Sequence, residues 1–225
     1  MDLKLIYGNM RALCEAPQMM LHYADIPYEY KMVWDHYGSS WAEVKKEIIF
    51  NRLPILIIDE DKYIWQSNTI IRYLSNLTKT KPSDEFQLAY CDAVFESTHE
   101  MFSPLNPTIN MTFGEKYNSN KKKLLEDILP NSLNNFEKLL QNSSGNFFIG
   151  NDPFYCDFNA YHHFSMCLIL DKNIFSNFPN LKKFINNFEK INNIKNYLDG
   201  RPELVELGKS PHFLIDGKKI PTGLN

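Results

Sequence analysis

Cysteine is scarce in this sequence, with 4 residues among 225. Cys14, Cys91, Cys156 and Cys167 are irregularly spaced, and no C-x-x-C pair occurs. The spacing excludes a disulfide scaffold and the usual zinc and dithiol motifs. We therefore expect a reduced chain in the cytosol.

Long apolar runs and a strong charge of one sign are also missing. No stretch approaches 18 apolar residues, and the first residues do not resemble a signal peptide, so we expect no membrane association. The 24 basic and 27 acidic residues leave a net charge of −3, which gives no electrostatic reason to bind nucleic acid. With 44% hydrophobic residues, the chain is typical of a folded globular protein.

The first third of the chain alternates between strand and helix patterns. Apolar, branched and aromatic runs predict strands at 3–7, 28–33, 53–58 and 63–65, and helical spacing predicts helices at 11–23, 41–48 and from Ser67 onward. Pro17 requires that the first helix either begin near Glu15 or bend. Pro54 opens its strand, where a missing N–H group is tolerated. Ser67 is a candidate N-cap.

The part of the chain between the Lys79–Asp84 linker and about residue 205 reads as helix. Phe86, Tyr90 and Val94 recur at helical spacing, and so do apolar residues further along the chain. We expect an α/β domain over 1–78 and an all-helical domain over 84–205. Prolines and glycines near the end predict an irregular tail over 206–225.

Several segments, in order, resemble the cytosolic glutathione transferases, closest to the tyrosine-type sigma and mu classes. They are Lys4-Leu5-Ile6-Tyr7, Trp41-Ala42-Glu43-Val44-Lys45, Phe50-Asn51-Arg52-Leu53-Pro54-Ile55-Leu56, Gln66-Ser67, and Phe148-Ile149-Gly150-Asn151 leading to Asp157-Phe158. The resemblance covers about the first 205 residues. It implies a thioredoxin-like domain followed by an all-helical domain, in a homodimer.

The resemblance places Tyr7 at the catalytic tyrosine position. A phenol with a pKa near 10 stays protonated at neutral pH and can donate to a thiolate. Lowering a thiol pKa by about two units requires roughly 2.7 kcal/mol, and a charge-assisted hydrogen bond supplies about 1.5–3 kcal/mol. Core packing with a solvated hydroxyl is the alternative for a tyrosine at a strand end.

The same resemblance assigns the remaining glutathione positions. Ser67 would bind the γ-glutamyl carboxylate at a helix N-terminus, with Gln66 orienting the same group. Leu53, before a cis Pro54, would expose backbone groups to the tripeptide. Trp41, Lys45 and Arg52 match positions near the glycine carboxylate, although exposed basic residues often only face solvent.

One helix of the second domain carries a polar stripe of Asp92, Glu96, His99 and Glu100. Such a stripe can simply be solvated. By the resemblance, Glu100 would reach the glutathione amine of the partner subunit. Some sigma enzymes bind a divalent cation at these positions, but His99 interrupts the acidic set, so we expect no metal. The His162-His163 pair also lacks a spaced partner ligand.

Some positions depart from the family pattern. Gly8 stands where an aromatic residue often follows the catalytic tyrosine, which would widen the electrophile pocket, and Leu13 replaces a basic residue near the thiolate. Phe154 occupies the Ser/Thr position of a capping box ending at Asp157, so Asp152 is an alternative cap. Cys14 could be reactive as in omega-type relatives, or a buried thiol.

The expected function is conjugation of glutathione to hydrophobic electrophiles. One alternative is a glutathione-dependent isomerase of the prostaglandin D synthase kind, which would share every glutathione residue. The other is a non-catalytic ligand-binding or assembly module on the same scaffold, for which loss of the glutathione residues would be the sign. Tyr7, Gln66 and Ser67 are all present, which favours an enzyme.

Overall fold

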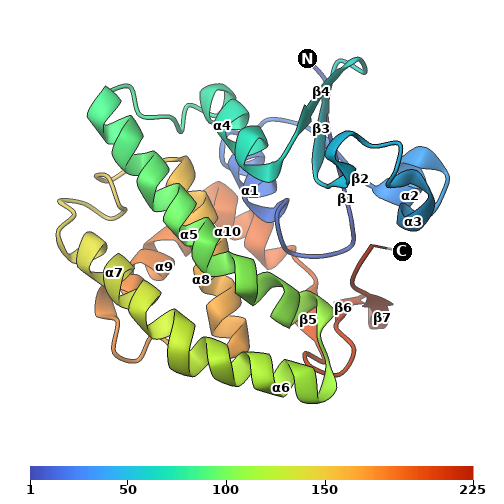
Figure 1. The fold of residues 1–225 in the computed structure, drawn as a ribbon. Helices are drawn as coiled ribbons and strands as arrows, with labels where there is room; N and C mark the ends of the chain where they lie inside the picture. Colours follow the sequence, from blue (N-terminus) through green and yellow to red (C-terminus); the bar gives the residue numbers. More distant parts are fainter. Residues whose placement is uncertain (225) are drawn as a thin grey trace.

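The computed structural model describes residues 1–224 (Figure 1). The first part contains β1 (Leu3–Tyr7), α1 (Glu15–Tyr23), β2 (Glu29–Met32), α2 (Val33–Tyr37), α3 (Trp41–Val44), a 3₁₀ turn (Ile49–Asn51), β3 (Ile55–Ile58), β4 (Lys62–Trp65) and α4 (Ser67–Leu77). The second contains α5 (Glu85–Met111), α6 (Gly114–Lys123), a π-helical turn (Leu124–Ile128), α7 (Leu129–Gln141), α8 (Tyr155–Leu170), α9 (Pro179–Glu189) and α10 (Asn192–Asp199). The chain ends with β5 (Glu203–Val205), β6 (His212–Ile215) and β7 (Lys218–Pro221).

The first part is a four-stranded mixed sheet in the order β2-β1-β3-β4. β1 runs parallel to β2 and antiparallel to β3, and β3 pairs with β4 in a hairpin. The expected order of strands and helices is confirmed, with α2 as an additional short helix in what we expected to be the end of a strand and a polar loop. α1 begins at Glu15, so Pro17 lies in the first turn, where its missing N–H costs no helical hydrogen bond.

The second part packs its helices around α8, which is buried on nearly every side. α5 runs along α8, while α1 of the first part contacts α4, α8 and α10 (Figure 1). Pro130 lies in the first turn of α7, and the π-helical turn immediately before it absorbs the break that the proline imposes. α8 is therefore the element around which the rest of this part is built.

The start of α8 is fixed by the carboxylate of Asp157. Its oxygens accept hydrogen bonds from the backbone N–H groups of Phe148, at 3.1 Å, and Phe154, at 2.9 Å. The phenyl ring of Phe154 cannot accept a hydrogen bond, so only the acidic half of a capping box operates. The expectation that Asp152 might cap this helix was wrong, because Asp157 itself binds the loop.

The C-terminal segment is ordered, and the expectation of an irregular tail was wrong for the residues described. β5, β6 and β7 form an antiparallel sheet, with Ile215 paired to Lys218 across a two-residue turn. Asp216 and Gly217 fill that turn with φ of 49° and 75°. An Asp-Gly pair favours this type of hairpin turn, since both positions need positive φ.

This segment is attached at two places. The N–H of Gly114 donates to the carbonyl of Gly208 at 2.8 Å. Near the end of the chain, Asn9 and Gly223 exchange two backbone hydrogen bonds of 3.0 Å, and the Asn9 Nδ2 donates to the Pro221 carbonyl at 2.6 Å. Pro221 and Gly223 are thereby held against the loop that follows β1 (Figure 1).

We predict that Asp157→Ala destabilises the fold by about 2–4 kcal/mol, because it leaves two backbone N–H groups without an acceptor. Asp152→Ala should change stability by no more than about 0.5 kcal/mol. Denaturant unfolding of both variants measures the difference. Equal, small losses would show that the Asp157 contacts do not stabilise α8.

Gly8→Ala should loosen the C-terminal segment, because a Cβ at Gly8 would lie 2.7 Å from the Gly223 carbonyl oxygen and against Leu224. We expect hydrogen exchange over 212–224 to accelerate about 5- to 150-fold, the equivalent of a typical overpacking cost. Gly200→Ala is the control, since its Cβ would meet only ordinary contacts of 3.6 Å or more. Unchanged exchange in Gly8→Ala would contradict the attachment.

Candidate functional site

Three of the expected site residues lie at the same end of the sheet, where β1 ends, β3 begins and β4 ends. We call this end of the sheet the strand edge. Ile6 pairs with Ile55, and Ile55 pairs with Trp65. The next positions are Tyr7 at the end of β1, Pro54 before β3 and Gln66 after β4. Because neighbouring strands lie about 4.8 Å apart, the register itself brings these three residues together.

The Tyr7 hydroxyl is buried and held by the backbone. The side chain is 4% exposed, and the Leu13 N–H donates to its oxygen at 3.3 Å. Burial raises the pKa of Tyr7, although the Leu13 bond opposes the shift, so the phenol is protonated at neutral pH. Its oxygen accepts one bond, and among residues 1–224 no acceptor lies within hydrogen-bond distance of its proton, which can therefore be donated to a sulfur.

The expectation that Ser67 is an N-cap was wrong. α4 begins at Ser67, and Gln66, with φ of 71°, holds the capping position without a side-chain bond to the helix. The Ser67 hydroxyl lies 3.5 Å from the Asn68 Oδ1. The first N–H groups of α4 therefore have no side-chain cap from residues 1–224, which suits a bound carboxylate.

The residues expected near a glycine carboxylate lie on α3 and the loop before β3. The Lys45 ammonium is 5.9 Å from the centroid of the Trp41 ring. Lys45 and Arg52 are both exposed, and neither pairs with a carboxylate within residues 1–224. Leu53 is buried and precedes a cis peptide bond to Pro54, as expected.

Two of the four residues in the polar stripe on α5, Asp92 and Glu96, contact side chains of α4. Arg72 pairs with Asp92, at 2.8 Å, and with Glu96. The Asn68 amide also donates to Glu96 at 3.2 Å. The interpretation of a simply solvated stripe is therefore wrong for Asp92 and Glu96, which connect the start of α4 to α5. Sequence reasoning did not identify Arg72 in this role.

Glu100 differs from its neighbours on the stripe. It is exposed and forms no ion pair or side-chain hydrogen bond with residues 1–224. His99 is half-buried, and burial lowers its pKa. The described part of the chain holds no group of three His, Cys, Asp or Glu side chains arranged to bind a metal ion.

Two of the departures from the family pattern are resolved by the geometry. The space that a Cβ at Gly8 would enter is filled by Gly223 and Leu224, and Gly8 also lines a cavity of about 490 Å³. Cys14 is fully buried, and burial raises its pKa well above the ordinary value. The buried-thiol interpretation of Cys14 is confirmed, since the reactive form of a cysteine is the thiolate.

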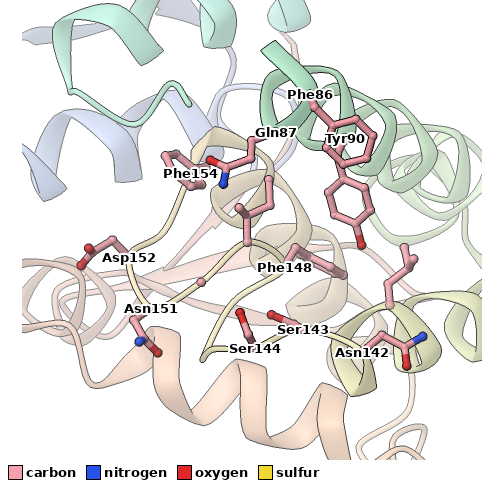
Figure 2. Close-up of a pocket in the computed structure, with 13 residues that line it drawn as sticks. Phe86, Gln87, Tyr90, Asn142, Ser143, Ser144, Phe148, Asn151, Asp152 and Phe154 are labelled. Atoms are coloured by element: carbon pink, nitrogen blue, oxygen red, sulfur yellow. The ribbon is translucent and has the colours of Figure 1, made fainter. Parts of the chain in front are cut away.

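Three cavities, of about 660, 620 and 490 Å³, are not lined by Tyr7, Pro54 or Gln66. The cavity of about 660 Å³ lies between α5 and the 142–154 loop, with Phe86, Tyr90, Phe148 and Phe154 among its lining residues (Figure 2). None of the expected glutathione residues contributes to it. The cavity of about 620 Å³ lies between α4 and α5, and the one of about 490 Å³ borders the loop between β1 and α1. Within residues 1–224, no helix combines the length and apolarity needed to cross a bilayer.

Comparison with known proteins agrees with this geometry. The model of the glutathione S-transferase N-terminal domain matches residues 1–76, and that of the C-terminal domain matches residues 99–201. A glutathione S-transferase of Plasmodium yoelii yoelii is 32% identical over 173 residues, which cover 75% of this chain and 79% of the relative. Glutathione S-transferase P of Caenorhabditis elegans is 29% identical over 205 residues, covering 89% and 94%.

Solved structures give the same result. The Pi-class glutathione S-transferase of Onchocerca volvulus matches with a TM-score of 0.77 and 27% identity, over 88% of this chain and 93% of that one. Rat hPGDS complexed with a quinoline matches with a TM-score of 0.79 over 90% and 98%, but at 24% identity it shows the fold alone. The chain belongs to the glutathione S-transferase family.

Proposed function

We propose that this chain conjugates glutathione to hydrophobic electrophiles, with Tyr7 stabilising the glutathione thiolate. The observation that carries the proposal is the Tyr7 hydroxyl, which is protonated, fixed by the Leu13 N–H and placed at the strand edge beside Pro54 and Gln66. A proton leaves the glutathione thiol for solvent, and the phenol donates a hydrogen bond to the sulfur that remains. The thiolate then forms a bond to the electrophilic carbon, and the leaving group departs with its electron pair.

The strand edge supplies groups suited to the rest of the tripeptide. In this proposal the uncapped start of α4 at Ser67 binds the γ-glutamyl carboxylate, and Gln66 orients the same group. The backbone of Leu53 pairs with the peptide, and Trp41, Lys45 and Arg52 surround the glycine carboxylate. Holding both reactants in place supplies a large part of the rate enhancement.

We further propose a homodimer in which Glu100 completes the site of the partner subunit. Three observations support this: Glu100 is exposed and unpaired within residues 1–224, and Ile49 and Phe50 are 53% and 61% exposed. Two large apolar side chains on one loop favour burial against another protein surface. The cytosolic location is part of the proposal, in keeping with four free cysteines.

Isomerisation rather than conjugation remains the alternative activity. Two structures of prostaglandin synthases share the fold of this chain: that of Nilaparvata lugens, at 20% identity, and rat hPGDS. Their activities do not extend to this chain on that basis. A non-catalytic role is disfavoured, because the Tyr7 hydroxyl accepts a hydrogen bond from the Leu13 N–H and is protonated, so Tyr7 is more than a packed ring.

Tyr7→Phe should lower turnover with a generic aryl halide by about 10- to 200-fold, because it removes the hydroxyl and keeps the ring. Glutathione affinity should change little, since the donor acts mainly on the ionised sulfur. Tyr63→Phe, on the exposed face of β4, is the matched control and should keep full activity. Wild-type turnover in Tyr7→Phe would remove Tyr7 from the mechanism.

Glu100→Ala should weaken glutathione binding by about 1–3 kcal/mol while the dimer persists, because a charged hydrogen-bond partner of the ligand is lost. Calorimetry measures the affinity and sedimentation the assembly state. Glu203→Ala, an exposed carboxylate on β5, should leave both unchanged. A fully active monomer would contradict both the role of Glu100 and the interface.

A further inference from the structure

The Tyr7 hydroxyl depends on one backbone group for its orientation. Among residues 1–224, its hydrogen-bond partner is the Leu13 N–H, at 3.3 Å. Leu13 lies in the loop between β1 and α1, two residues before Glu15, at which α1 begins. A donor on a loop stays in place only as well as the loop does, so the contacts that hold this loop decide where the hydroxyl points.

Two contacts with the second part of the chain bracket Leu13. The Asn110 amide of α5 donates to the Arg11 carbonyl at 3.4 Å. The Arg201 Nη1 lies 2.7 Å from the Glu15 Oε1. Arg11 and Glu15 lie two residues before and two residues after Leu13. The first contact is a long hydrogen bond between neutral groups, whereas the second joins two charges at short distance, so the Glu15–Arg201 pair is the stronger restraint.

The Glu15–Arg201 pair is largely shielded from water. The side chains of Glu15 and Arg201 are 3% and 17% exposed. Burial alone would raise the pKa of the Glu15 carboxyl, but attraction to Arg201 and the other basic groups nearby outweighs burial and holds that pKa below its usual value. The carboxylate is therefore charged at neutral pH. Loss of either partner would leave the other charge buried and unpaired.

A closed turn connects Glu15 to Leu13. The Glu15 N–H donates to the Ala12 carbonyl at 3.2 Å, so Leu13 and Cys14 lie inside that turn. Cys14 is fully buried, which leaves the turn no room to shift toward the core. A displacement of Glu15 therefore moves the Leu13 N–H with it.

Arg201 belongs to the second part of the chain. It follows α10, and its guanidinium lies 5.9 Å from the centroid of the Tyr197 ring. Its Nε is buried without an acceptor among the described residues, so the Glu15 carboxylate is what holds the guanidinium there. A lysine has no group equivalent to this Nε and keeps the positive charge, so Arg201→Lys can preserve the ion pair.

We propose that Arg201 is a positioning residue for the conjugation reaction, which acts through Glu15 and the Leu13 N–H to direct the Tyr7 hydroxyl at the glutathione sulfur. The inference rests on the proposed role of Tyr7. It gives the end of the second part a function in the chemistry of the first, because the hydroxyl is correctly directed only when the two parts are packed together.

The test measures turnover of an aryl halide and the pKa of the bound glutathione thiol, the latter by ultraviolet difference absorbance. Glu15→Gln removes the charge and keeps the shape of the side chain. It should lower turnover about 3- to 30-fold, within the roughly 100-fold that a small misplacement can cost, and raise the thiol pKa. The Michaelis constant for glutathione should change little. Arg201→Gln should behave in the same way, and Arg201→Lys should stay close to the wild type. Glu189→Gln is the matched control, because Glu189 is exposed on α9 and should change neither quantity.

The same substitution in a Tyr7→Phe background separates positioning from a general loss of structure. If the pair acts through the hydroxyl, Glu15→Gln should lower turnover no further once that hydroxyl is gone. Equal losses in the two backgrounds, or an unchanged thiol pKa in folded Glu15→Gln, would overturn the proposal. If the single variants do not fold, the double variant Glu15→Gln/Arg201→Gln takes their place, because it leaves no buried charge unpaired.

The restraint can also be measured without the reaction. In the protein free of glutathione, amide NMR of Leu13 should show exchange with solvent about tenfold faster in Arg201→Gln and unchanged in Arg201→Lys. Wild-type turnover in Tyr7→Phe would defeat the proposed function. An impaired Tyr7→Phe together with a normal Leu13 N–H and a normal thiol pKa in Arg201→Gln would overturn this inference alone.

Discussion

The pairing of β3 with both β1 and β4 is the constraint on which the site depends. Each strand contributes one residue at the same edge: Tyr7 ends β1, Pro54 precedes β3, and Gln66 follows β4. A slip of one residue in either pairing would turn every side chain of the shifted strand to the opposite face of the sheet. The apolar run at 55–58 is buried throughout, as expected for a strand that pairs on both sides.

Contacts between the two parts of the chain hold in place the helix and the loop that flank this end of the sheet. Arg72 on α4 pairs with Asp92 and Glu96 on α5, which sets the position of the helix start at Ser67. After β1, Gly223 exchanges two backbone hydrogen bonds with Asn9. The loop between these contacts carries the Leu13 N–H that orients Tyr7. The Tyr7 hydroxyl is thus oriented by a backbone N–H group of the loop between β1 and α1. The same loop is hydrogen-bonded to the C-terminal segment through Asn9.

The sequence allowed much of this to be predicted, and the failures have physical causes. Branched apolar runs identified the strands, and the resemblance carried by Tyr7, Pro54 and Gln66 located the edge. Ser67 was misassigned as a cap because the positive φ of Gln66 follows from tertiary context and is rare for a residue with a Cβ. The terminal hairpin was missed because its prolines and glycines outweighed the Asp216-Gly217 signal. The cavity that borders the loop between β1 and α1 joins residues as far apart as Gly8 and Ile215, which no local pattern reveals.

Titrating the bound glutathione thiol tests the central claim most directly, because the proposed hydrogen bond acts on the ionisation of that sulfur. The thiolate is followed by ultraviolet difference absorbance as the pH is raised, with protein in excess. A free thiol has a pKa of about 8.5, and a donor supplying roughly 2.7 kcal/mol would lower it by about two units. The account predicts a midpoint near pH 6.5. A midpoint at the value of free glutathione, with the tripeptide bound, would contradict it.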